Sequence, residues 1–559
     1  MNGNCSTTGC KNPERLPDTD RLEQQWKTIN WKKAETEVSR LQARIAKATQ
    51  EKKWNTVKRL QYLLTHSYYA KVLAVKKVTS NKGKRTSGVD KELWSTPATK
   101  MRGVLTLTDK HYKAKPLRRV YIEKPGKKKK RPLGIPCMYD RAMQALYALA
   151  LAPVAETTAD TRSFGFRKGR CTQDACAAIF AVLCRKDSAQ WVLEGDIKGC
   201  FDHISHDWLV EHIPMDKSVL KQFLKAGFIF RDELFPTDEG TPQGGVISPT
   251  LANMALDGMQ KILSDRFHTG KNGRISGRAR DAHKVNLVRY ADDFIVTAAT
   301  KEIAEEAKIL IRDFLKTRGL ELSDEKTLIT HIDDGFDLLG WTFRKFKGKL
   351  IIKPSKKAMK TFKANLHDTI LGQGKAWEQD MLIRKLNQQI RGWANYHQAV
   401  CASEAYSNID YTLFQILWRW AKRRHPQKGR KWIAARYWHS VGTRNWVFST
   451  ENQKLLSLSD TPIIRHPQIR ISANPYLDTQ YFIDRKFKHG IKRLTGRFKR
   501  VWKKQKGCCY HCGRPIDIGE DKEIFYKIPK EVGGKDEVPN MAYVHRHCRI
   551  IFQERRTKV

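Results

Sequence analysis

Residues 286–297 read Asn-Leu-Val-Arg-Tyr-Ala-Asp-Asp-Phe-Ile-Val-Thr. Two apolar, β-forming runs flank the adjacent acids Asp292 and Asp293, which predicts a β-hairpin with both carboxylates at its tip. Adjacent carboxylates repel each other and are costly to desolvate unless a divalent cation supplies the compensating charge. An exposed Asp-Asp turn has the same local pattern. The hairpin alone therefore leaves a metal site and a plain turn as alternatives.

A second strand end favours the metal site. Residues 190–202 begin with an apolar strand that ends at a third acid, Asp196. Three acids can share a pair of Mg²⁺ ions, because Mg²⁺ prefers carboxylate oxygen. In nucleotidyl transfer, one ion lowers the pKa of the primer 3′-hydroxyl and the other neutralises the pyrophosphate. We therefore expect Asp196, Asp292 and Asp293 to be catalytic residues that hold two Mg²⁺ ions.

The composition indicates a polyanionic partner. The chain has 559 residues, too many for one hydrophobic core, so we expect several domains. It carries 105 Lys and Arg against 58 Asp and Glu, a formal net charge of +47. Enzymes of small metabolites do not need such a charge, and nucleic acid is its simplest partner.

Apolar runs and cysteines bear on the compartment. No run of eighteen apolar residues occurs, and residues 1–18 lack the apolar core of a secretory signal. The twelve cysteines are scattered and do not resemble a disulfide framework. We expect a protein of the cytoplasm, or of a bacterial or organellar interior, with no membrane partner.

Several further blocks carry a family resemblance. Tyr290-Ala-Asp-Asp resembles the reverse-transcriptase catalytic box, and Asp196 with Phe201 resembles the first catalytic strand of that family. Six other blocks follow the order found in reverse transcriptases encoded by group II introns: 81–90, 118–136, 163–170, 240–249, 319–327 and 336–341. The resemblance is strong over 79–445 and looser elsewhere.

The resemblance implies an α+β right-hand polymerase with fingers, palm and helical thumb. It implies five domains, which are a basic helical extension, fingers with palm, a thumb or maturase domain, a basic DNA-binding region and a small zinc module. Their expected bounds are 1–78, 79–354, 355–445, 446–506 and 507–559. Residues 485–506 contain eleven Lys or Arg and no acid, which suits nucleic-acid binding.

Five residues are candidates for binding the nucleotide substrate. Lys124 and Arg131 lie on a glycine-containing hairpin and can clamp a triphosphate, whereas the neighbouring lysines 127–130 suit nonspecific attraction of the template. Gln243 lies between turn residues and would approach the nucleotide or template base, the alternative being a plain β-turn.

The other two candidates have equally ordinary alternatives. Phe201 resembles an aromatic residue of this family whose ring excludes a ribose 2′-hydroxyl, although an aromatic residue there can also be part of the core. Lys326 is a candidate acid for protonating pyrophosphate, although a lysine in Ser-Asp-Glu-Lys is more often a solvated turn residue.

Residues 386–397 resemble the maturase region of intron-encoded proteins. Such a helix buries Ile390 and Trp393 and turns Lys385 and Arg391 towards structured RNA. An apolar helical stripe is usually core packing, so the periodicity alone does not indicate splicing.

The last fifty residues resemble an HNH nuclease module. Cys509 and Cys512, with His545 and Cys548, have the spacing of a structural Zn²⁺ site, and Cys508 or His547 are alternative ligands. The module departs from its family at residues 525–529, Phe-Tyr-Lys-Ile-Pro, where a His-His pair is usual, and at Arg549, where a metal-binding histidine is usual. Phenylalanine is neither a base nor a metal ligand, so we expect nicking to be lost and DNA binding to remain.

The expected function is that of an RNA-directed DNA polymerase and intron maturase. Its expected partners are the host group II intron RNA, a target DNA and deoxynucleoside triphosphates. The main alternative is a non-mobile, RNA-binding splicing factor that retains the polymerase fold, and the three acids argue against it. The maturase-like and HNH-like segments disfavour a bacterial reverse transcriptase that serves defence or template-directed mutagenesis, and Phe525 and Tyr526 disfavour a homing endonuclease.

Overall fold

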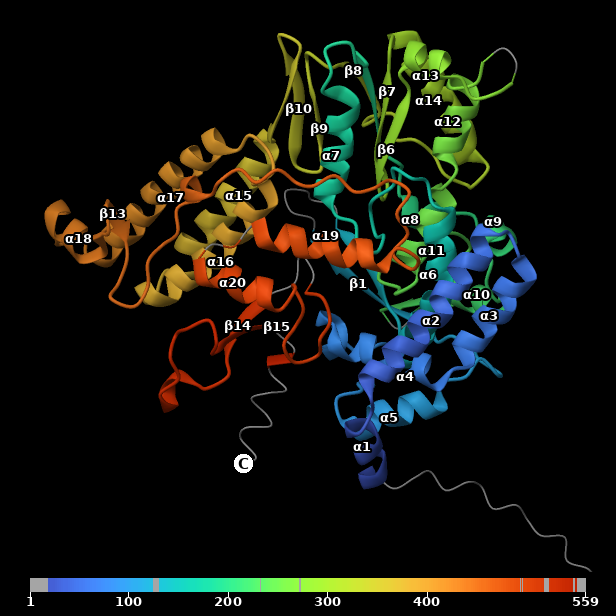
Figure 1. The fold of residues 1–559 in the computed structure, drawn as a ribbon, viewed down its shortest axis with the longest axis horizontal. Coiled ribbons are helices and arrows are strands. Elements are labelled where there is room, and N and C mark those ends of the chain that lie inside the picture. The colour runs from blue at the N-terminus through green and yellow to red at the C-terminus, as the bar shows by residue number, and fades with distance from the viewer. Residues whose placement is uncertain are drawn as a thin grey trace, which may run out of the picture. The chain divides into compact units, whose positions relative to one another are not determined.

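A computed structural model gives the fold of the chain (Figure 1). It describes residues 19–123, 130–231, 233–270, 273–492, 494, 496–516, 522–545 and 548–549. The chain divides into two compact units that interleave along the sequence. The first comprises 1–159, 199–257 and 317–320, and the second comprises 160–198, 258–316 and 321–559. No described helix is long and apolar enough to cross a membrane.

The first unit begins with the helices that the sequence predicts over residues 20–78. Their apolar stripes pack on α6 (Met138–Thr158) and α5 (Pro97–Thr106), and Ile45, Leu64 and Val75 are fully buried. These helices are α1 (Thr19–Lys27), α2 (Trp31–Gln50), α3 (Trp54–His66) and α4 (Tyr68–Ser80).

The first unit also contains a four-stranded sheet, in the order β2-β1-β4-β5. The antiparallel pair β1 (Leu117–Ile122) and β2 (Arg131–Ile135) is the hairpin expected from the block at 118–136. The other elements of this unit are β4 (Phe228–Phe230), β5 (Glu233–Phe235), η1 (Lys82–Arg85), α8 (Cys200–His203), α9 (His206–His212), α10 (Lys217–Leu224) and α11 (Ser248–Leu256).

The second unit is built on another four-stranded sheet, in the order β6-β7-β3-β8. Val192, Val288 and Ile295 lie in the same core as helix α7, while α14 packs on β3 and β7. The elements are α7 (Thr172–Leu183), β3 (Trp191–Gly195), α12 (Met259–Phe267), α13 (Gly277–His283), β6 (Asn286–Tyr290), β7 (Asp293–Ala298), α14 (Lys301–Lys316) and β8 (Leu328–His331).

The core of this sheet continues into a helical region. Trp341, Leu386 and Trp420 belong to the same buried cluster as Ile295, so sheet and helices share one hydrophobic core. The elements are β9 (Phe336–Leu338), β10 (Trp341–Phe346), β11 (Lys349–Pro354), α15 (Lys356–His367), the π-helical turn η2 (Asp368–Gln373), α16 (Gln379–His397), α17 (Ser403–Arg424) and α18 (Arg430–Tyr437).

The helical pattern expected up to residue 445 ends earlier. Strands β12 (Trp438–Val441) and β13 (Arg444–Phe448) form a hairpin instead. Its aromatic and β-branched residues favour strands, and Gly442 adopts the positive φ of 63° that a tight turn requires. The prediction of helix over residues 438–445 was therefore wrong.

The C-terminal part of the second unit has a small core of its own. Trp502, Phe525, Tyr543 and Val544 are buried together. The elements are η3 (Leu458–Asp460), α19 (Thr479–Lys492), α20 (Gly496–Lys504), β14 (Lys522–Tyr526), η4 (Lys530–Val532) and β15 (Met541–His545).

Candidate active site

The paired acids lie at the tip of a β-hairpin, as the sequence predicts. Strands β6 and β7 pair up to Tyr290 and Asp293, so Ala291 and Asp292 form the turn. Ala291 has a positive φ of 58°, a conformation that non-glycine residues adopt rarely and mainly in tight turns.

The neighbouring strand β3 brings the third acid to the same end of the sheet. The ladder between β3 and β7 ends at Gly195 and Phe294, so Asp196 and Asp293 are the next residues on each strand. Glu194 and Ile295 are cross-strand partners. Because side chains alternate along a strand, Asp196 and Asp293 project from the same face as those partners.

The three acids interact electrostatically. Burial, together with the negative charges of Asp292 and Asp196, raises the pKa of Asp293 to about 6. Burial and mutual repulsion of this kind are what a bound divalent cation relieves, and the donors are all carboxylate oxygens. The residues therefore fit a Mg²⁺ site.

Two lysines face the acids. Lys326 Nζ lies 2.5 Å from Asp196 Oδ2, and this hydrogen bond raises the pKa of Lys326. The loop that carries Lys326 is held by Ser323, whose backbone N–H donates to the Asp196 carbonyl at 2.8 Å. Lys357, at the start of α15, lowers the pKa of Asp293 through its charge. Lys326 is thus engaged with a carboxylate rather than simply solvated.

Two glycines leave room for this arrangement, and sequence reasoning did not single them out. A Cβ on Gly195 would lie 2.1 Å from Cζ of the Phe294 ring, and a Cβ on Gly165 would lie 2.3 Å from the backbone nitrogen of Ala291. Phe164 N–H donates to the Arg289 carbonyl at 2.9 Å, which ties the block at 163–170 to the hairpin. The recurrence of glycine in these blocks was the available signal.

The nucleotide-binding candidates Phe201, Gln243 and Arg131 belong to the first unit. The Phe201 carbonyl accepts from Thr241 N–H at 2.6 Å. Gln243 Nε2 donates to both Asp202 carboxylate oxygens at 3.0 and 3.1 Å, and its carbonyl accepts from Gly134 N–H of β2 at 2.7 Å. Arg131 is exposed at the start of β2, and Lys124, like lysines 127–129, lies outside the described residues.

The C-terminal cysteines and histidine converge into a group that could hold a metal ion. One ligand atom from each of Cys509, Cys512, His545 and Cys548 lies within 4.8 Å of the others. His545 Nδ1 is 3.4 Å from Cys512 Sγ and 3.8 Å from Cys548 Sγ. Three sulfurs and one imidazole fit a tetrahedral Zn²⁺. Cys508 is not in this group, and His547 lies outside the described residues.

The positions that depart from the HNH pattern have structural roles. The Phe525 side chain is buried in the core of the module. Arg549 Nη1 donates to the Glu523 carboxylate at 2.6 Å. Asn540, which is one of the residues that resemble the HNH pattern, donates to the carbonyls of Ile528 and Lys535 at 3.0 and 2.8 Å, which fixes the loop before β15.

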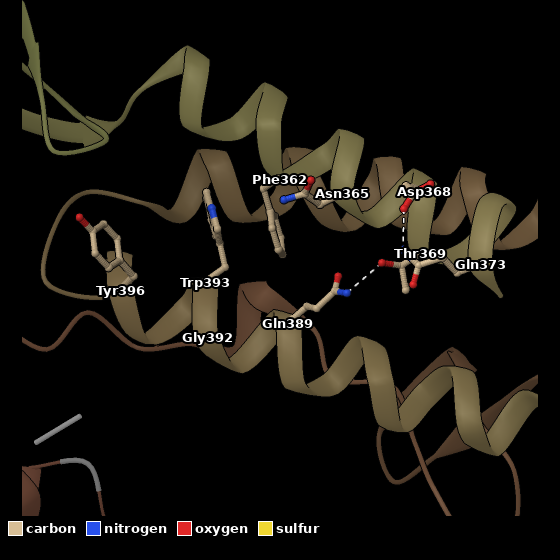
Figure 2. A pocket seen from close by; sticks show the side chains of 9 residues that line it. All are labelled: Phe362, Asn365, Asp368, Thr369, Gln373, Gln389, Gly392, Trp393 and Tyr396. Carbon is tan, nitrogen blue, oxygen red and sulfur yellow. Dashed lines mark hydrogen bonds between the residues drawn. The ribbon is translucent and has the colours of Figure 1, made fainter. Parts of the chain in front are cut away.

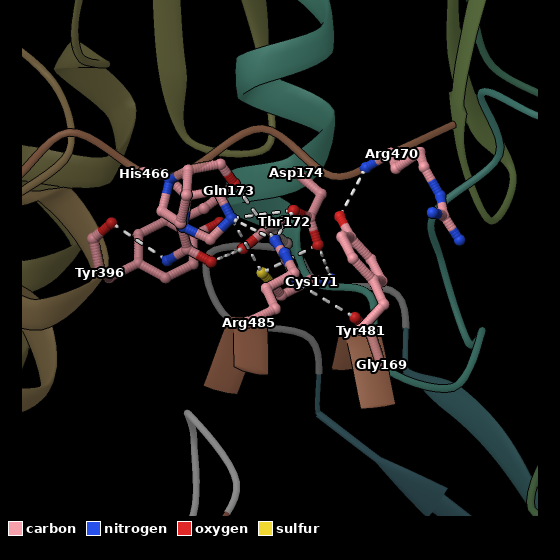
Figure 3. Close-up of polar contacts among 11 residues, drawn as sticks. Gly169, Cys171, Thr172, Gln173, Asp174, Tyr396, His466, Arg470, Tyr481 and Arg485 are labelled. Atoms are coloured by element: carbon pink, nitrogen blue, oxygen red, sulfur yellow. Dashed lines mark hydrogen bonds and ion pairs between the residues drawn. The ribbon is translucent and has the colours of Figure 1, made fainter. Parts of the chain in front are cut away.

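A buried polar joint that the sequence did not suggest fastens α19 to the start of α7 (Figure 3). Arg485 Nη2 pairs with Asp174 Oδ1, and His466 Nε2 lies 2.8 Å from the same oxygen and 2.9 Å from the guanidinium. Burial alone would raise the pKa of Asp174, but the His466 hydrogen bond and the Arg485 charge lower it overall. Cys171 completes a group that geometry would allow to bind a metal, but the guanidinium already supplies the cation.

Comparisons with known proteins match several segments of the chain. Family models match four segments: the N-terminal domain of reverse transcriptase at 26–107, reverse transcriptase (RNA-dependent DNA polymerase) at 122–343, the group II intron maturase-specific domain at 359–438 and HNH endonuclease at 509–549.

Curated relatives agree with these models. The chain is 32% identical to the group II intron-encoded protein LtrA of Lactococcus lactis subsp. cremoris over 384 residues, 58% of this chain and 63% of that protein. It thus spans less than two thirds of LtrA. It is 33% identical to protein YkfC of Escherichia coli K12 over 51% of this chain and 82% of that protein. Maturase-like protein 1 of Euglena gracilis is 23% identical over 69% of this chain and 79% of that protein.

Proposed function

This chain belongs to the family of reverse transcriptases encoded by group II introns, and we propose that it is an RNA-directed DNA polymerase that also acts as maturase of its host intron RNA. The observation that carries the polymerase activity is the set of Asp196, Asp292 and Asp293 at one end of the β3/β7 ladder. We also propose the domain bounds given above, and the two compact units interleave between residues 160 and 320.

In this proposal the three aspartates hold two Mg²⁺ ions. The ions supply the positive charge that activates the primer 3′-hydroxyl and stabilises the pyrophosphate. The β-hairpin fixes Asp293 against Asp196, and the tight contact of Gly165 with Ala291 keeps the turn in place. Lys326, paired with Asp196, is positioned to deliver its proton to pyrophosphate.

Neutralising the acids tests the polymerase activity. Asp196→Asn, Asp292→Asn and Asp293→Asn should each lower primer extension on an RNA template by at least about 10²-fold, because each removes charge that stabilises the transition state. Asp281→Asn, at an exposed position, is the matched control and should extend primers at the wild-type rate. Full-speed extension by any of the three variants, with melting temperatures unchanged, would refute the proposal.

We propose a role in substrate binding for each of four residues. Lys124 and Arg131 clamp the triphosphate, Gln243 contacts the nucleotide or template base, and the Phe201 ring excludes a ribose 2′-hydroxyl. Two hydrogen bonds support the roles of Phe201 and Gln243. Thr241 N–H donates to the Phe201 carbonyl, and Gln243 donates to the Asp202 carboxylate, so the loop 240–245 lies against residues 201 and 202. Phe201→Val should raise incorporation of ribonucleotides relative to deoxynucleotides, and an unchanged ratio would exclude the role of the ring.

The maturase activity is supported by the maturase-specific model over 359–438. On α16, Leu386 and Ile390 are buried, whereas Lys385 and Arg391 are exposed and available to RNA phosphates. Splicing of the intron RNA that surrounds the gene should require the purified protein at moderate Mg²⁺. It should fall in Lys385→Ala/Arg391→Ala and persist in Asp292→Asn, because the two activities use different residues.

We propose that the C-terminal module binds target DNA around a structural Zn²⁺ but does not nick it. This is supported by the burial of Phe525 and by the engagement of Arg549 with Glu523, at the two positions where nuclease histidines are usual. Without a nick, a pre-existing DNA end would prime reverse transcription at the target. A Mg²⁺-dependent nick that survives Asp292→Ala and disappears in Asn540→Ala would contradict this.

A further inference from the structure

A pocket of about 560 Å³ opens between the helices α15 and α16 of the second unit. Phe362, Asn365 and Thr369 line one wall at helical spacing, and Gln389 and Trp393 line the other (Figure 2). A volume of this size is within the range of small-ligand pockets in proteins. Neither the polymerase chemistry nor the zinc module uses it.

The pocket has an aromatic end and an amide end. At the aromatic end, the rings of Phe362 and Trp393 stack with centroids 5.0 Å apart and an interplanar angle of 11°. At the other end, Gln389 Nε2 donates to Thr369 Oγ1 at 2.9 Å. Gln389 Oε1 is buried and has no hydrogen-bond partner among the described residues. A buried acceptor of this kind is costly unless a ligand donates to it.

Two backbone features open the pocket. The turn η2 is π-helical from Asp368 to Gln373, a rare conformation that is frequent at functional sites. On the facing helix, a Cβ added to Gly392 would meet nothing within 4 Å, although glycine inside a helix costs about 1 kcal/mol relative to alanine. Both features lower helix stability at residues that line the pocket.

These properties of the pocket favour a flat heterocycle over a phosphate as its ligand. Asp368, which accepts from Gln373 Nε2 at 2.8 Å, gives the pocket a negative charge that repels phosphate. The exposed Lys385 lies one helical turn before Gln389 and can bind a phosphate outside the pocket. An aromatic face, amide groups and an orphan acceptor are what proteins use to bind unstacked bases.

We propose that this pocket binds a single unstacked base of the RNA that the protein holds. The proposal rests on the RNA binding proposed above and deepens it. Helix α15 connects the pocket with the acids, since Lys357 acts on Asp293 and Asn365 lines the pocket. Eight residues of helix span about 12 Å.

Photocrosslinking tests the pocket. The full chain is mixed with an unstructured RNA 20-mer that carries 4-thiouridine at one internal position, irradiated, and digested for mass spectrometry. We expect crosslinks on Phe362 or Trp393, and we expect them to disappear when a complementary strand pairs the 4-thiouridine. Gln389→Leu should lower the crosslink yield at least fivefold, whereas Gln388→Leu, the same change on the neighbouring exposed residue, should not.

A second variant guards against misfolding. Gly392→Leu fills the opening and removes a helical glycine, so it should lose the crosslink without a lower melting temperature. Overall affinity for the 20-mer is measured by filter binding in the same samples. RNA bound with wild-type affinity but crosslinked only outside the pocket, or absence of binding to the 20-mer, would overturn this inference alone, whereas failure of the splicing test above would overturn the proposed maturase activity.

Discussion

At the scale of single residues, the position of the acids at the end of the sheet depends on Gly195, which has no side chain. Gly195 faces Phe294 across the ladder, with the ring where a Cβ would be. Gly195→Ala should therefore push the two strands or the ring apart and displace Asp196 from Asp293. We expect primer extension to fall about tenfold or more, because small misplacements of catalytic groups are costly.

A double variant gives the control for this prediction. Phe294→Leu shortens the opposing side chain, so Gly195→Ala/Phe294→Leu should extend primers faster than Gly195→Ala alone. The measurement is single-turnover primer extension beside a thermal melt of each variant. If the second substitution restores nothing, the clash is not the cause of the defect.

Local sequence patterns predicted part of the active site and the C-terminal Cys/His group. The paired acids, the hairpin and the convergent Cys/His group follow from local patterns: adjacent Asp292 and Asp293, and the pair Cys509 and Cys512. Gly195 was not predicted because its role depends on which residue lies opposite, and pairing register is not encoded within one strand.

At the scale of the element, α16 carries a buried histidine that makes the helix sensitive to acid. His397 is 2% exposed, and burial lowers its pKa from 6.5 to about 4. Between these values the unfolded chain binds a proton that the folded chain does not, so stability is complete above pH 6.5 and falls as the pH drops towards 4. The loss is on the order of 3 kcal/mol.

The variant His397→Phe should flatten this dependence. Its melting temperature should change less between pH 7 and pH 4.5 than that of the wild type, because the phenyl ring does not titrate. His367→Gln, at an exposed position of α15, is the control and should follow the wild type. Parallel curves for His397→Phe and the wild type would assign the acid sensitivity to other groups.

The joint between α7 and α19 predicts a second element-scale effect. Arg485→Met leaves the buried Asp174 carboxylate without its cation, which typically costs about 3–5 kcal/mol. We expect faster hydrogen exchange at the start of α7 and throughout α19. Arg470→Met, which breaks the more exposed pair with Asp478, should have little effect.

Periodicity explains which elements were predictable. Apolar spacing over residues 386–397 predicted the helix α16 and the burial of Ile390 correctly, because that signal lies within the helix, whereas Trp393, which was expected to be buried, is only partly buried. The hairpin of β12 and β13 was missed because the aromatic residues near Trp438 fit either a helix or a strand. Arg485 was read as part of a nucleic-acid-binding segment, and nothing local indicates its partner Asp174, which is 311 residues away.

At the scale of the whole molecule, the zinc module should be separable from the polymerase. Its core residues, among them Trp502 and Val544, form a cluster of their own. Cys512→Ser should remove the bound Zn²⁺ and unfold this module, since structural zinc contributes directly to folding. Primer extension should persist, because the acids lie on the sheet β6-β7-β3-β8 and not in this module.

The matched control is Cys508→Ser, at the cysteine outside the metal-binding group. It should retain one zinc per chain by native mass spectrometry and should melt like the wild type. Loss of zinc from Cys508→Ser, and not from Cys512→Ser, would require a different ligand set.

The strand order β6-β7-β3-β8 also has a consequence for synthesis on the ribosome. The central strand β3 emerges first, and its partner β7 begins at Asp293, about a hundred residues later. At about 5–20 residues per second, β3 waits roughly 5–20 s with both edges unpaired. Exposed strand edges invite aggregation. Both edges of β3 can be paired only after residue 331, the end of β8, has emerged.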